Sequence, residues 1–144
     1  MRWLVGLALV SLLTVAGCSG GDGRVPVSGT VTLNDQALPG AALSFTPTGE
    51  THGQNAIAAT GPDGKYSVMG PQGQKGLHPG TYKVTVSRLL RKDGTPPRPD
   101  LPPIESDGVE SLPPHYSDPE KTTLTITVEG KKDYNLSLKL EKKQ

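Results

Sequence analysis

Pro79-Gly-Thr-Tyr-Lys-Val-Thr-Val-Ser87 is the most regular alternating segment of this 144-residue sequence. Tyr82, Val84 and Val86 fall on one side of an extended chain and polar residues fall on the other, as in a strand with one buried face. The Pro79-Gly80 pair marks the start of the strand, because proline cannot donate a ladder hydrogen bond and glycine permits a tight reversal. We therefore expect this segment to be an inner strand of a small antiparallel β protein.

Six further short segments with strand character flank this one. The turn at residues 61–64 is expected to close a hairpin between residues 56–60 and 65–68, and residues 134–140 are expected to bury alternate side chains as far as Leu140. No window shows helical spacing of apolar residues over three turns. The sequence thus predicts an all-β, seven-stranded antiparallel sandwich of immunoglobulin-like type. The expected strands are residues 25–33, 42–47, 56–60, 65–68, 79–87, 122–128 and 134–140.

Composition limits the classes of partner. The chain has 15 Lys and Arg against 14 Asp and Glu, and Arg2 is the only charged residue among the first 17, which leaves 14 of each sign beyond them. A near-neutral chain gives no electrostatic reason to expect a nucleic-acid partner. With one cysteine in the chain, no intramolecular disulfide is expected either.

The N-terminus reads as a targeting segment. A short positive start is followed by the apolar residues 4–15 and then by Val15-Ala-Gly-Cys18. The apolar run is too short for a spanning helix of about 20 residues, so residues 1–17 are predicted to be a signal peptide. The four residues that end in Cys18 resemble the lipobox of bacterial lipoproteins. That resemblance implies cleavage after Gly17, lipidation of Cys18 through a diacylglyceryl thioether, and often a further N-linked acyl chain such as palmitate.

The residues after the cysteine form a short tether. Residues 18–24 are rich in glycine, and the six residues from Ser19 would span about 12–15 Å as a flexible coil, so the domain is expected to stay close to the lipid surface. Ser19, in place of Asp, resembles lipoproteins that are passed on to an outer membrane. The expected location is the bacterial cell envelope, with the outer membrane favoured over the inner one if two are present. The structured domain is expected to cover residues 25–144.

Three phrases in a fixed order resemble the carboxypeptidase regulatory-like domain. They are the segment from Val27 to Phe45 with its Pro-Gly-Ala entry to the second strand, Thr60-Gly-Pro-Asp-Gly-Lys-Tyr66, and Pro79-Gly-Thr-Tyr-Lys-Val-Thr-Val86. The resemblance implies a transthyretin-like seven-stranded sandwich over about residues 25–140. Gly61 departs from the Asp that is common in the second phrase, and a long Pro-rich insertion before the penultimate strand departs from the minimal domain.

No arrangement of side chains points to catalysis. The histidines fall in three separate loops, at His52, His78 and His115, and no pair has the spacing of metal ligands. Aspartates occur in turns, where they commonly cap their own backbone, although calcium binding at one of them stays open. We therefore expect no enzyme activity, no catalytic residues, no metal and no cofactor.

The insertion at residues 89–121 is expected to contain no regular element, which in a compact domain points to a functional or a disordered loop. Residues 91–103 hold five prolines among charged residues and are expected to stay exposed, whereas residues 112–119 are expected to pack back on the sandwich with Tyr116 as anchor. The exposed part is the expected partner-binding segment. The candidate interaction residues of the loop are Arg91, Lys92, Arg98 and Tyr116. The alternative is a passive disordered insertion.

The sequence thus favours a membrane-anchored, non-enzymatic envelope module that contacts another protein or the envelope. A carbohydrate- or cell-wall-binding sandwich is the alternative, and an enzyme is a minor one. Trp3 would be lost with the signal peptide, so only tyrosines would remain to stack on a sugar. The sequence names neither the partner nor the oligomeric state.

Overall fold

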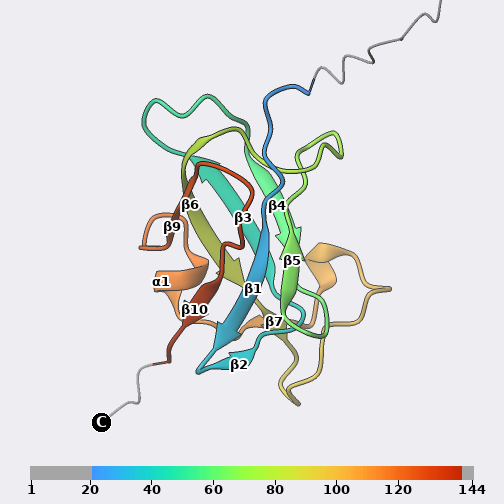
Figure 1. The fold of residues 1–144 in the computed structure, drawn as a ribbon. Helices are drawn as coiled ribbons and strands as arrows, with labels where there is room; N and C mark the ends of the chain where they lie inside the picture. Colours follow the sequence, from blue (N-terminus) through green and yellow to red (C-terminus); the bar gives the residue numbers. More distant parts are fainter. Residues whose placement is uncertain (1–20, 141–144) are drawn as a thin grey trace, which may run out of the picture.

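The computed structural model describes residues 21–140, and in this part of the chain the protein is all-β, as predicted. This part of the chain has ten strands, several of them very short, and one single-turn helix. Figure 1 shows how they are arranged. The strands are β1 (Ser28–Leu33), β2 (Gln36–Ala37), β3 (Ala42–Pro47), β4 (Ala56–Ala59), β5 (Lys65–Ser67), β6 (Gly80–Ser87), β7 (Leu89–Leu90), β8 (Val109–Glu110), β9 (Thr125–Val128) and β10 (Leu136–Leu138). A 3₁₀ turn covers Pro103–Glu105, and α1 covers Pro114–Ser117.

Every segment predicted as a strand contains one, and three two-residue strands were not predicted. The additional strands are β2, β7 and β8, which are too short to show alternation in the sequence. β7, β8 and α1 all lie in residues 89–121, so the prediction that this segment has no regular element is wrong. Short pairings of this kind are held by tertiary contacts, which a sequence pattern does not record.

One sheet contains the segment that was predicted to be an inner strand. Its order is β4-β3-β6-β9, with all neighbours antiparallel, so β6 is paired on both sides as predicted. The pairing of β6 with β3 extends from Tyr82 opposite Pro47 to Ser87 opposite Ala42. Tyr82, Val84 and Val86 are fully buried on the inner face of this sheet.

The second sheet is built around β1, and one of its pairs corrects the antiparallel prediction. β1 pairs antiparallel with β2 and β5, but it pairs parallel with β10 through Val31 opposite Leu136 and Leu33 opposite Leu138. A parallel pair needs a long connection, and here nearly the whole domain lies between the two strands. Alternation in the sequence predicts a strand but not the direction of its neighbour.

The predicted hairpin between residues 56–60 and 65–68 is also corrected. The turn exists, since the Gly64 amide donates to the Gly61 carbonyl at 2.9 Å. The strands on either side of it nevertheless enter different sheets, with β4 against β3 and β5 against β1. They meet again only through one bridge, in which Ile57 and Met69 exchange two backbone hydrogen bonds. Local turn residues predict the reversal but not the partners of the two strands.

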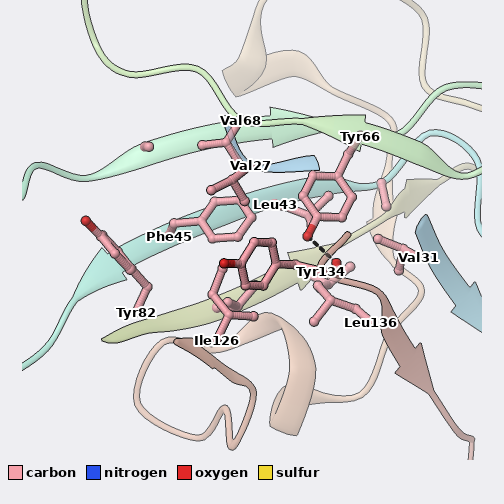
Figure 2. Packing of buried hydrophobic residues seen from close by; sticks show 14 of the residues in the cluster. Val27, Val31, Leu43, Phe45, Tyr66, Val68, Tyr82, Ile126, Tyr134 and Leu136 are labelled. Carbon is pink, nitrogen blue, oxygen red and sulfur yellow. Dashed lines mark hydrogen bonds between the residues drawn. The ribbon is translucent and has the colours of Figure 1, made fainter. Parts of the chain in front are cut away.

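The core lies between the inner faces of the two sheets. Figure 2 shows Phe45 of β3 stacked on Tyr66 of β5 at 5.9 Å between ring centroids, with Val27 and Leu43 beside them. The Tyr66 hydroxyl donates a 2.5 Å hydrogen bond to the carbonyl of Tyr134, so this buried polar group is satisfied. The remaining core residues are mainly valine and leucine.

One core prediction fails at the C-terminal end. Leu136 and Leu138 are buried as expected, but Leu140 is 39% exposed. β10 ends at Leu138, and the Leu140 amide donates to the side chain of Asn34 instead of continuing the ladder. The alternating pattern therefore extends one position beyond the sheet that it was expected to cover.

Candidate functional site

The segment between β6 and β9 forms a small hairpin at one end of the sheets. Leu89 of β7 pairs with Glu110 of β8, and Leu90 pairs with Val109. We call residues 89–110 the distal hairpin. β6 begins at Gly80 and ends at Ser87, and the distal hairpin follows directly after it. The hairpin therefore lies at the C-terminal end of β6, about 24 Å from the start of that strand.

Glu110 fixes the base of the distal hairpin. One of its carboxylate oxygens accepts hydrogen bonds from the amides of Arg88 at 3.1 Å and Leu112 at 2.9 Å. The other accepts a 2.5 Å hydrogen bond from the hydroxyl of Ser87, the last residue of β6. Charge-assisted bonds of this kind are stronger than neutral ones, so the hairpin is held to the end of the sheet at a defined angle.

An ion-pair cluster holds the two arms of the hairpin together. Asp107 lies 3.8 Å from Arg91 and 3.6 Å from Arg98, while Arg91 also lies 3.5 Å from Asp93. Arg91, Asp93 and Asp107 border a hollow of about 550 Å³ that Lys92 and Val109 also line. Hydrogen bonds from Thr95 hold the pKa of Asp93 below its ordinary value, and the charge of Arg91 lowers it further.

The predicted basic residues Arg91, Lys92 and Arg98 therefore lie on one hairpin, but among side chains of both charges. The distal hairpin carries three basic residues against five acidic ones, so it is not a basic patch. Arg91 is two-thirds covered and engaged by two carboxylates, whereas Arg98 and Lys92 are exposed. Both arginines form ion pairs within the hairpin.

The sequence reasoning missed the apolar surface of the same hairpin. Ile104 is 94% exposed, Val109 is 61% exposed and Leu89 is 42% exposed. They make up half of the large exposed hydrophobic side chains in residues 21–140. A single exposed aliphatic residue needs no explanation, but several on one small element are a feature of interaction sites. The only signal in the sequence was an isolated Ile or Val within a Pro-rich, charged segment.

The predicted docking of residues 112–119 is confirmed. Leu112 is 4% exposed and Tyr116, on α1, is 9% exposed. The Tyr116 hydroxyl donates to the Lys139 carbonyl at 3.0 Å and accepts from the Lys139 amide at 2.9 Å. Tyr116 thus anchors the segment to the chain just beyond β10 and is not available as a surface contact.

At the opposite end of the molecule, two histidines that are distant in sequence line the same hollow. His52 and His78 come from the loops before β4 and before β6, and together with Arg24 they line one hollow of about 530 Å³. The third histidine, His115, lies against the ring of Tyr116 instead, with centroids 4.1 Å apart. In residues 21–140 no group of three His, Cys, Asp or Glu side chains could hold a metal ion.

An uncharged hollow lies on the outer face of the β4-β3-β6 part of the first sheet. It has a volume of about 820 Å³ and carries no charged side chain. Ile57 and Met69 border it, and its floor is formed by small residues such as Ala42, Ala59 and Ser44. Its lining provides apolar contact and a few hydroxyl groups, but no acid or base.

The predicted lipidation site, Cys18, lies outside the described residues, as does the apolar run that precedes it. Among residues 21–140, no helix has the length and apolar character needed to cross a bilayer. Comparison with known proteins finds no matching family model, no matching curated protein and no matching solved structure.

Proposed function

We propose that this chain is a lipid-anchored, non-enzymatic protein of the bacterial cell envelope that binds another protein through its distal hairpin. The observation that carries the proposal is the position of the only cysteine. Cys18 directly follows Val15-Ala-Gly17 at the end of an apolar run, in the pattern of a lipobox. On this proposal, signal cleavage makes Cys18 the N-terminus, and two or more acyl chains hold the protein at the membrane.

The proposed domain is a carboxypeptidase regulatory-like, transthyretin-like sandwich. Support comes from seven strands within the predicted ranges, in two sheets that share one core, and from the turn at Gly61 and the inner strand that starts at Gly80. The short strands β2, β7 and β8 are then local additions to that architecture.

The position of the distal hairpin supports a role in binding. The described chain starts at the end of the sheets that contains the loops before β4 and before β6, as Figure 1 shows. A Cβ built on Gly80, the first residue of β6, would contact the side chain of Thr51 in the loop before β4. The distal hairpin follows the other end of β6, so a protein anchored through residues 18–24 would present it away from the lipid surface.

The surface of the hairpin supports a protein partner. Ile104 and Val109 supply exposed apolar contact area, and Lys92 and Arg98 lie nearby on the same element. Apolar anchors with a charged surround are the usual composition of a protein interface. The carbohydrate alternative has less support, because all four tyrosines are buried and offer no ring face to a sugar.

A pull-down with matched variants tests the proposal. The bait is the full chain, crosslinked in membranes and analysed by mass spectrometry, beside Ile104→Ser and the control Ile57→Ser, which changes an exposed isoleucine on β4. Burying one isoleucine is worth about 1.5–3 kcal/mol, so loss of Ile104 should reduce recovery of a specific partner about tenfold or more. Equal recovery with both variants would exclude the hairpin as the interface, and retention on cell-wall glycan would favour the alternative.

A further inference from the structure

The hollow at the end of the molecule where the chain enters has the side chains of an anion site. Seven of its lining residues carry polar side chains that can donate hydrogen bonds, and none is a carboxylate: Arg24, Thr51, His52, Gln54, Gln72, Gln74 and His78. We call it the tether-end hollow. It encloses about 530 Å³, and a second hollow of about 660 Å³ adjoins it at His52 and His78.

Arg24 is the fixed cation of this hollow. Its side chain is only 10% exposed, and the neighbouring Val25 is locked to Leu77 by two backbone hydrogen bonds of 2.7 and 3.0 Å. Its Nε donates to Asp22 at 2.6 Å, and one terminal nitrogen makes a long 3.5 Å contact with the Gly76 carbonyl. Asp22 engages Nε alone, so the terminal nitrogens keep donor capacity for a second, planar oxygen ligand.

The other polar side chains of the tether-end hollow also retain hydrogen-bond donors for a ligand. The side-chain Nε2 of Gln74 donates to the side-chain Oε1 of Gln72 at 2.9 Å, and the Oε1 of Gln74 accepts from the backbone amide of Gln72 at 3.1 Å. The side-chain nitrogen of Gln72 takes no part in this pair. His78 lies beside the incoming chain, since a Cβ on Gly23 would be 3.8 Å from its Nδ1. The charged groups around the hollow are Asp22 on Arg24, Glu50 in the adjoining hollow and the exposed Lys75.

We propose that the tether-end hollow binds a phosphate group, and that its ligand is the phosphodiester of an anionic phospholipid head group. Guanidinium and amide donors suit phosphate oxygens, and a hollow without a carboxylate in its lining does not repel them. The source of the phosphate rests on the proposed anchor. Arg24 is six residues after Cys18, about 12–15 Å of flexible chain, so a lipidated Cys18 would bring the hollow among the head groups. Binding there would orient the domain, with the distal hairpin pointing outward.

The test uses a soluble chain that begins at residue 19. The core residues of the described chain lie between Val27 and Leu138, so this chain keeps the whole core and does not depend on lipidation. It is titrated with short-chain phosphatidylglycerol, short-chain phosphatidylcholine and inorganic phosphate, and backbone amide shifts are followed by NMR. We expect saturable shifts at the residues of the hollow with phosphatidylglycerol and much weaker ones with phosphatidylcholine.

Matched variants distinguish lipid binding in the tether-end hollow from general electrostatic attraction between the protein and the lipid. Removing one cation near a lipid surface costs about 1 kcal/mol, so Arg24→Gln should weaken phosphatidylglycerol binding about fivefold or more. His52→Ala, at an exposed position, removes a donor from the lining and should weaken it too. Lys75→Gln removes a positive charge near the hollow but outside its lining and should change the affinity by less than about twofold.

Each outcome decides one part of the proposal. Equal weakening by Arg24→Gln and Lys75→Gln would overturn the site and leave general electrostatics. Saturable binding of inorganic phosphate, with no preference between the two lipids, would overturn the lipid assignment while supporting an anion site. Because the chain lacks Cys18, a failure here does not touch the proposed lipidation, which is measured separately on the membrane-extracted protein.

Discussion

Gly29 lies so close to the backbone of a neighbouring segment that a side chain has no room there, and Gly29→Ala is therefore a sharp test of the fold. A Cβ at this residue would lie 2.1 Å from the carbonyl oxygen of Tyr134 and 2.6 Å from its carbonyl carbon. Real Cβ contacts are essentially never shorter than 3.0 Å, so the backbone of Tyr134 would have to move by almost 1 Å. That carbonyl is also the acceptor of the buried Tyr66 hydroxyl.

The size of the effect follows from these two contacts. Overpacking of this kind costs about 1–3 kcal/mol, and loss of the Tyr66 hydrogen bond adds about 1 kcal/mol. Gly29→Ala should therefore lower the free energy of unfolding by about 2–4 kcal/mol, a large part of the 5–15 kcal/mol that is typical of a native protein.

Urea unfolding of the chain from residue 19 measures this difference, with Gly130→Ala as the control. A Cβ on Gly130 would meet no atom within 4 Å, and its backbone has no positive φ, so the control should change stability by less than about 0.5 kcal/mol. If both variants were equally stable, β1 could not approach the chain before β10 as closely as described, and the parallel pairing of these strands would be in doubt.

Three further outcomes are expected. Val84→Asp should unfold the domain in a thermal melt because it places a charge in the core, whereas Lys83→Asp, on the outer face of β6, should cost about 0.5 kcal/mol or less. Equal losses of stability in the two variants would mean that the register of β6 is wrong. Limited proteolysis should cut first within residues 91–111, and cutting at Tyr116 just as fast would contradict its role as anchor. Burial raises the pKa of Tyr66 in the folded state. The free energy of unfolding therefore keeps its full value below the pKa that Tyr66 has in the unfolded chain, and it should fall by about 1.4 kcal/mol per pH unit above about pH 10. Tyr66→Phe should remove that component of the alkaline loss, and an unchanged pH dependence would refute the assignment.

The sequence contained most of the strands but not their partners. The alternation in residues 80–87 was sufficient to predict an inner strand, because Pro79-Gly80 marks its start, its apolar face is continuous and other alternating segments flank it. The parallel placement of β10 and the separation of β4 from β5 depend on long-range packing, which no local pattern records. Leu140 shows the same limit, since alternation continued past the end of the sheet.

The candidate sites were predictable to different degrees. Prolines and charges marked residues 92–100 as a segment that is exposed except at the half-buried Pro97, and the apolar side chain of Tyr116 marked the docked part. The exposure of Ile104 could not be predicted, because an isolated aliphatic residue in a loop is as often buried as displayed. The sequence also could not predict that His52 and His78 line one hollow, because this depends on which loops the two sheets place at the same end of the molecule.

The anchor is the central claim, and the intact mass of the protein extracted from membranes tests it most directly. The mass should be that of a chain that begins at Cys18, with residues 1–17 removed and the added mass of a diacylglyceryl group, with or without a further acyl chain, on that residue. The same measurement on a Cys18→Ser variant should give no acylated species. A soluble or membrane-extracted protein with an unmodified Cys18 would contradict the account.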